Sequence, residues 1–93
     1  MKKTICEVVL ITDNKYEHID QEELTLIKWF DNNYNGYMIT REIYTCDKNK
    51  NIILEFAFET TEKNADNQIQ IIKEKFENVY GNAILKSRRF YKV

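Results

Sequence analysis

The sequence predicts a single α+β domain of the ferredoxin-like class over residues 1–93, with elements in the order strand, helix, strand, strand, helix, strand. Residues 51–60 alternate with the period of a strand, and two further segments repeat apolar residues at helical spacing. Polar or glycine-containing turns separate the segments. Two split βαβ units with right-handed crossovers then give a four-stranded antiparallel sheet, ordered 4-1-3-2, with both helices on one face.

The composition limits the classes of partner. Of 93 residues, 43% are hydrophobic and 31% charged, and the net charge of −1 argues against bulk attraction to nucleic acid or anionic lipid. No stretch is long and apolar enough to span a membrane. The apolar run after Lys2-Lys3 is short and contains Glu7, so it does not fit a secretion signal. We expect a cytoplasmic protein with no membrane partner.

The strand at 51–60 should form the floor of the core. Its apolar face comprises Ile52, Leu54, Phe56 and Phe58. Residues 4–12 are β-branched and apolar on both faces, which is typical of a central strand, and Cys6, Val8 and Leu10 should face the core.

A helix is predicted over about 21–34. Asp20 is its expected N-cap, because Glu23 follows three residues later to complete a capping box. The apolar stripe comprises Leu26, Ile27, Phe30 and Tyr34. Trp29 falls well outside that stripe, so it either belongs to a partner surface or folds over the edge of the core or packs between the helices.

A second helix should follow a Thr60 or Thr61 cap, run to about Tyr80 and end at Gly81. Its apolar stripe comprises Ala65, Ile69, Ile72, Phe76 and Val79. Ile71 lies on its other side.

Residues 37–46 and 82–92 complete the predicted sheet, and the polar turn at 47–50 makes a hairpin with the strand at 51–60. In 37–46 the facing stays open, since Arg41 interrupts the more apolar set. In 82–92 the alternation sets Ile84, Lys86, Arg88 and Phe90 against Leu85, Ser87, Arg89 and Tyr91.

The predicted strand order keeps the two cysteines apart. Cys6 and Cys46 lie on strands with another strand between them, so their backbones should be roughly 9–10 Å apart. A disulfide needs Cα atoms within about 7 Å. We expect reduced thiols.

Phe56-Ala57-Phe58 resembles part of the aromatic signature that RNA-recognition motifs carry on their third strand, where aromatic rings stack on bases. That resemblance implies phenylalanines that face solvent. It would also turn Glu55 and Glu59 into the core, where unpaired carboxylates are costly, so the interior placement of the two rings is preferred.

The basic cluster of the last strand comprises Lys86, Arg88, Arg89 and Lys92, with Phe90 and Tyr91 between them. It could bind nucleic acid through phosphate contacts and stacking. The preferred interpretation is a cross-strand charge ladder in which Lys86 or Arg88 lies beside Glu7, which in turn neighbours Glu55.

Acidic residues crowd the first loop and helix start: Asp13, Glu17, Asp20, Glu22 and Glu23. Their spacing fails the calcium-loop pattern, and His18 lacks further ligands at zinc spacing, so no metal or cofactor is predicted. No nucleophile–base pair or phosphate-binding loop is evident, so an enzyme is not expected.

The preferred hypothesis is a small non-enzymatic protein-binding module whose partner surface combines Asp13, Glu17, Asp20, Glu22, Glu23 and Trp29. Residue usage rich in Lys, Asn and Ile suggests AT-rich codons, and hence a phage or mobile-element inhibitor of a host protein, of anti-CRISPR or other anti-defence type. The expected partner is a host or phage protein. One alternative is a protein that binds RNA or single-stranded DNA through Lys86, Arg88, Arg89 and Phe90. Another is a dimeric ligand-binding regulatory domain, so the chain is expected to be a monomer or a homodimer.

Overall fold

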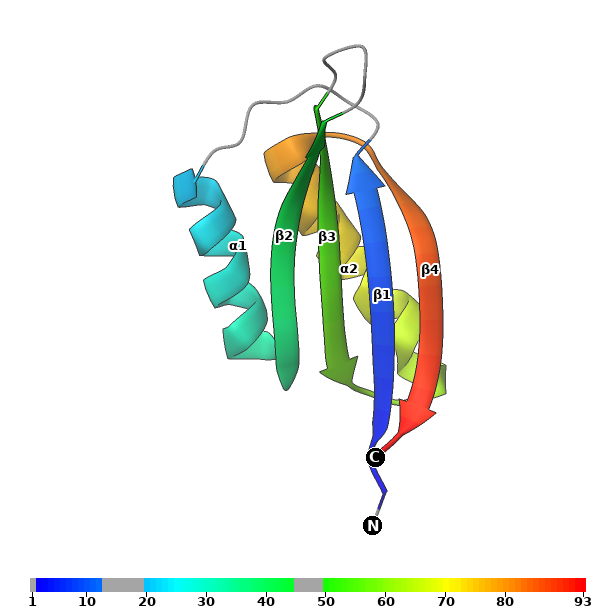
Figure 1. Ribbon diagram of the computed structural model, residues 1–93. Helices are drawn as coiled ribbons and strands as arrows, with labels where there is room; N and C mark the ends of the chain where they lie inside the picture. The colour runs from blue at the N-terminus through cyan, green and yellow to red at the C-terminus, as the bar shows by residue number, and fades with distance from the viewer. Residues whose placement is uncertain (1, 13–19, 45–49) are drawn as a thin grey trace.

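The computed structural model describes residues 2–12, 20–44 and 50–93, with the side chains of Asp20, Tyr44 and Lys50 left aside. Its elements are β1 (Thr4–Thr12), α1 (Asp20–Asn33), β2 (Gly36–Tyr44), β3 (Lys50–Glu59), α2 (Glu62–Tyr80) and β4 (Ala83–Lys92). They form one sheet with α2 behind it and α1 beside β2 (Figure 1). Neither helix of the described chain is long and apolar enough to cross a lipid bilayer.

The sheet confirms the predicted fold class and strand order. The strands lie in the order β2-β3-β1-β4, which is 4-1-3-2 read from the other edge, and every neighbouring pair is antiparallel. Val8 of the central strand β1 pairs with Phe56 of β3 on one side and with Arg88 of β4 on the other.

The core lies between the sheet and the helices. Phe56 and Phe58 are fully buried, so the predicted interior placement of the two rings is confirmed. The Phe30 ring of α1 packs edge-on against both of them, with centroid distances of 5.9 Å to Phe56 and 6.4 Å to Phe58. Burial of each such side chain contributes about 1.5–3 kcal/mol, which holds the helix layer on the sheet.

The second helix begins and ends at residues with a clear physical role. The Thr61 side chain accepts a hydrogen bond from the Asn64 backbone N–H at 3.2 Å, so Thr61 is the N-cap. Gly81 ends the helix at a φ of 88°, a conformation that glycine adopts without a steric penalty. The buried stripe differs from the prediction at its end, because Tyr80 is fully buried whereas Val79 is only half-buried.

The facing of β2 is decided by its pairing with β3. Met38 lies opposite Phe56 and is buried, so Tyr37, Ile39, Arg41 and Ile43 turn to the other face. At the start of the strand a Cβ on Gly36 would lie 1.8 Å from the Ala57 carbonyl oxygen. Glycine is required there because the two backbones approach too closely for a side chain.

The predicted alternation along β4 is wrong at its start. The register with β1 shifts between Val9 and Leu10, so that Ser87 pairs with Val9 while Leu85 pairs with Leu10. The residue between them, Lys86, is the extra residue of a β-bulge. As a result, Ile84 shares a face with Arg89, whereas a regular strand would place it with Arg88.

The face of the sheet opposite the helices is called the open sheet face below. Its members are Ile5, Glu7, Val9 and Ile11 of β1; Tyr37, Ile39, Arg41 and Ile43 of β2; Ile53, Glu55, Ala57 and Glu59 of β3; and Ile84, Ser87, Arg89 and Tyr91 of β4.

Candidate functional site

A groove of about 370 Å³ runs between the two helices. Its walls are Glu22, Thr25, Leu26 and Trp29 of α1, with Lys75, Asn78 and Val79 of α2. The spacings of three and four residues within each set place their side chains on one side of each helix. The groove is therefore a direct product of how two regular helices lie against each other, and we call it the interhelical groove.

Trp29 is held in place within this groove. Its ring meets the Tyr34 ring edge-on at a centroid distance of 5.7 Å, and the Lys75 ammonium lies 5.2 Å from the Trp29 ring centroid. A cation at that distance is attracted to the face of the indole. Trp29 is half-buried and packs partly against the core, so it presents the rest of its surface from a fixed position.

Both charge signs border the interhelical groove. Glu22, in the first turns of α1, is exposed, and Lys75 stands on the opposite wall. Elsewhere on α2, the Lys73 ammonium lies 3.3 Å from a Glu77 carboxylate oxygen, and neither residue lines the groove. The groove thus offers an aromatic surface with an acidic group on one side and a basic group on the other.

The predicted partner-binding residues are only partly brought together. Glu22 and Trp29 both line the groove, whereas Glu23 is half-buried on α1 and is not part of its wall. Asp13 and Glu17 lie outside the described residues, as does His18. Asp20 is the first residue of α1, and its predicted capping contact falls on a side chain that the structure does not describe.

Sequence reasoning missed the α2 wall of the groove. Lys75, Asn78 and Val79 are spaced by three and one, so they form a strip beside the buried stripe of that helix. A helical projection of α2 could have singled out this strip. It could not have shown that the strip faces Trp29.

The basic cluster of β4 does not form one surface. Arg89 lies on the open sheet face, where its Nε donates to a Glu7 carboxylate oxygen at 2.9 Å. Arg88 points to the helix side, pairs with Asp66 of α2 and stands 5.6 Å from the Phe90 ring centroid. Phe90 itself is half-buried against the core.

The predicted charge ladder is therefore wrong in its partners. Arg89, not Lys86 or Arg88, lies opposite Glu7, and the β3 neighbour of Glu7 is Ala57. Glu55 instead pairs with Arg41 of β2. The reason is register: side chains in a strand alternate, so a shift of one residue moves each charge to the other face.

Cys6 is a buried, unpaired thiol on the core face of β1. Burial raises the pKa of the Cys6 thiol, and the positive charge of Arg88 offsets part of that rise. A thiol with a raised pKa is a poor nucleophile at neutral pH. Cys46 lies outside the described residues, and within the described ranges no group of three or more His, Cys, Asp or Glu is placed to hold a metal ion.

No family model matches the chain, and no curated protein matches it. Among solved structures, the chain is similar to the uncharacterized protein TM1266 from Thermotoga maritima, with 13% sequence identity and a TM-score of 0.44. That alignment covers 100% of this chain and 96% of the other. A likeness at this level supports no statement about function.

Proposed function

We propose that the chain is a small non-enzymatic protein-binding module that captures its partner through the interhelical groove. The observation that supports this proposal is the position of Trp29, which is half-buried and held between Tyr34 and Lys75 while it lines an open groove. Tryptophan side chains at fixed positions carry much of the binding energy of protein interfaces, because they bury a large area with little loss of rotamer freedom.

The chemistry of the groove indicates what kind of segment fits. Leu26 and Val79 add aliphatic surface to the indole, and Glu22 supplies a carboxylate at the edge. An apolar side chain next to a basic one would complement these groups. Ile71 is exposed on α2 one helical turn before Lys75, so it extends the apolar area beside the groove.

We further propose that the partner is a host protein and that the chain acts in the cytoplasm as an inhibitor from a phage or mobile element, of anti-CRISPR or other anti-defence type. This part of the proposal depends on the small size of the chain and on its Lys-, Asn- and Ile-rich residue usage, not on the geometry of the groove.

The arrangement of charges gives less support to the alternative hypothesis, in which the chain binds RNA or single-stranded DNA, than to protein binding. The guanidinium groups of Arg88 and Arg89 already have carboxylate partners in Asp66 and Glu7. The two arginines also point to opposite sides of the sheet, so they do not jointly track one phosphate backbone.

The test is a pull-down from a lysate of a low-GC bacterium, with the affinity-tagged chain as bait, followed by titration of the captured protein. Trp29→Ala and Glu22→Lys should each abolish capture. Tyr91→Ala, which removes a partly exposed aromatic ring from the open sheet face, is the matched control and should leave capture unchanged.

Trp29 also provides a direct readout, because it is the single tryptophan of the chain. Its fluorescence should shift when the captured protein is added. Thermal unfolding of each variant shows whether the fold is kept, and Glu22→Lys changes an exposed side chain, so it isolates binding from folding. If Trp29→Ala and Glu22→Lys both capture the partner as well as the parent chain does, the groove is not the binding site.

A further inference from the structure

The open sheet face is unusually apolar for a surface that faces solvent. Isoleucine occurs on every strand of it: Ile5 and Ile11 of β1, Ile39 and Ile43 of β2, Ile53 of β3 and Ile84 of β4. Antiparallel sheets with one solvated face ordinarily alternate apolar and polar residues, so that the outer face is polar. This face departs from that pattern.

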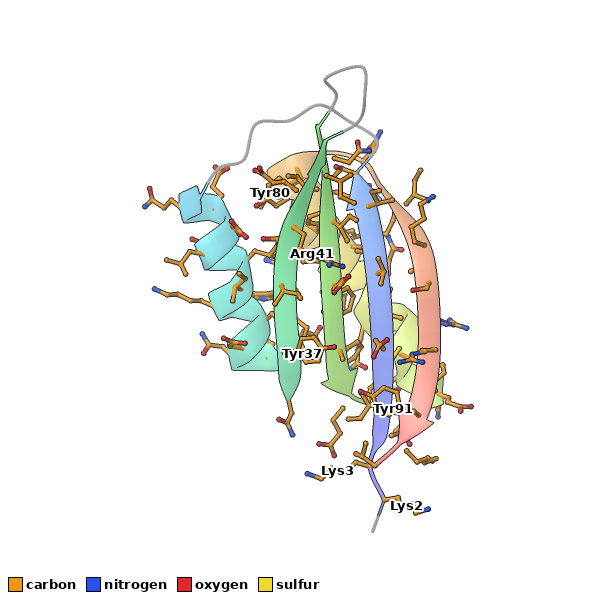
Figure 2. The ribbon with its side chains drawn as sticks, viewed as in Figure 1. Lys2, Lys3, Tyr37, Arg41, Tyr80 and Tyr91 are labelled. Carbon is orange, nitrogen blue, oxygen red and sulfur yellow. The ribbon has the colours of Figure 1, made fainter. Side chains whose placement is uncertain are left out.

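Of these isoleucines, Ile39, Ile43 and Ile84 are exposed, whereas Ile5, Ile11 and Ile53 are half-buried. Tyr37 is 50% exposed, Ile39 45%, Ile43 42% and Ile84 48%. Figure 2 views this face, with Tyr37 and Arg41 on β2 and Tyr91 on β4 at its two edges. A contiguous apolar surface of this extent marks an interaction site.

Four of the six isoleucines, Ile11, Ile43, Ile53 and Ile84, lie toward one end of the sheet, whereas Ile5 lies at the other. Ile11 pairs with Ile53 on one side and with Ile84 on the other, so three strands contribute adjacent aliphatic side chains. Arg41 pairs with Ile53 at the β2 edge of the same row, and Ile43 follows two residues later. Such a row provides apolar contact area for sheet-on-sheet packing.

The charges on this face balance one another. Arg89 pairs with Glu7 at 2.9 Å, Arg41 pairs with Glu55, and the Lys3 ammonium lies 3.8 Å from a Glu59 carboxylate oxygen at the end of the sheet. Nucleic acid would require an excess of positive charge here. A face that meets an identical copy of itself must instead avoid an excess of either sign, because every charge is presented twice.

The area of the open sheet face is large enough for a specific dimer interface. Four strands at about 4.8 Å spacing and nine residues at about 3.4 Å per residue give a flat footprint of about 19 Å by 30 Å, or roughly 570 Å². Two copies would together bury roughly 1,140 Å², which exceeds the roughly 1,000 Å² in total that a specific interface needs.

We propose that the open sheet face is a homodimer interface, in which two copies of the chain pack sheet against sheet and leave both helix layers outside. The occupant is a second copy because the face is largely apolar, its charged groups are paired with one another or with Lys3, and its area is sufficient. The inference does not depend on the interhelical groove, which lies on the other side of the sheet.

The experiment is light scattering coupled to size exclusion on the full chain, from about 1 µM to about 100 µM. The chain should elute with twice its monomer mass of 11.2 kDa. Ile39→Lys and Ile84→Lys, which place a charge on the open sheet face, should each give the monomer mass. Both positions are 45% or more exposed, so the fold of a single copy should tolerate the change, and circular dichroism checks it.

Leu24→Lys is the matched control. Leu24 is 52% exposed on α1, so the variant adds the same charge at a similar exposure on the helix side, and it should remain dimeric. A parent chain that is monomeric throughout the concentration range overturns the proposal, including the case in which that monomer binds an RNA oligonucleotide. So does a dimer that survives Ile39→Lys and Ile84→Lys, which would indicate pairing through strand edges or helices.

Discussion

Arg89 of β4 lies directly opposite Glu7 of β1, and its Nε donates a hydrogen bond to a Glu7 carboxylate oxygen at 2.9 Å. The preceding residue, Arg88, turns to the helix side and pairs with Asp66. Two consecutive arginines of this edge strand therefore form ion pairs on opposite faces of the sheet. This division follows from the alternation of side chains along β4, and it neutralises both guanidinium groups within the chain.

The first prediction concerns this pair. Glu7→Arg places two guanidinium groups opposite each other and should lower the melting temperature, because like charges directly opposite in an antiparallel pair are destabilising. In the parent chain the hydrogen bond and charge of Glu7 raise the pKa of Arg89. An arginine side chain also stays protonated without such a partner, so both guanidinium groups of the variant carry a positive charge throughout a folding experiment. Thermal unfolding at one low protein concentration measures the effect.

The double swap Glu7→Arg with Arg89→Glu is the control, and it should recover most of the lost melting temperature. The difference between the single and double variants should shrink in about 1 M salt, where the screening length falls to about 3 Å. A double variant as unstable as the single one would mean that the pair contributes nothing specific.

The second prediction concerns Thr12, a buried polar residue at the end of β1. Its hydroxyl accepts a hydrogen bond from the Ile52 backbone N–H at 2.8 Å and donates to the Ile52 carbonyl oxygen at 3.4 Å. Thr12→Val keeps the shape but removes the partner of a buried N–H. The free energy of unfolding should fall by about 1–3 kcal/mol, as measured by urea denaturation.

Thr12→Ser keeps the hydroxyl and loses only a methyl group, so it should retain more stability than Thr12→Val. The opposite ranking would show that the methyl group, not the hydrogen bond, is what the site requires.

The third prediction concerns Cys6, studied in a Cys46→Ser background so that one thiol remains. Burial raises the pKa of Cys6, so in the native protein it should react slowly with a thiol reagent, and rapidly once denaturant exposes it. Equal rates in the two states would contradict its buried position.

The same pKa difference predicts the direction of a pH effect. In the unfolded chain the thiol ionises from about pH 8.5, whereas in the folded chain it resists ionisation to a higher pH. Stability should therefore decline as the pH rises past about 8.5. Cys6→Ala removes this contribution, so the decline should be shallower in that variant when both are measured by urea denaturation across the same pH series.

The sequence by itself determined the order of elements and the interior of the sheet. Phe56 and Phe58 fall two apart in a strand whose other positions include Glu55, and burying the aromatic set while solvating the carboxylate is the cheaper arrangement. The regular spacing of apolar residues in α2 fixed its buried face in the same way. Both patterns lie within single segments, so they can be recognised in the sequence without knowledge of how the segments pack.

Tertiary structure alone decided which side chains meet across elements. The bulge at Lys86 places Ile84 on the open sheet face. The sequence of β4 does not indicate this bulge, because the bulge arises from the pairing of β4 with β1. Trp29 was recognisable as lying off its helical stripe, but its neighbour Lys75 is set by how two helices pack on one sheet. Register and packing depend on contacts between distant segments, so they are settled only when all strands and helices are in place.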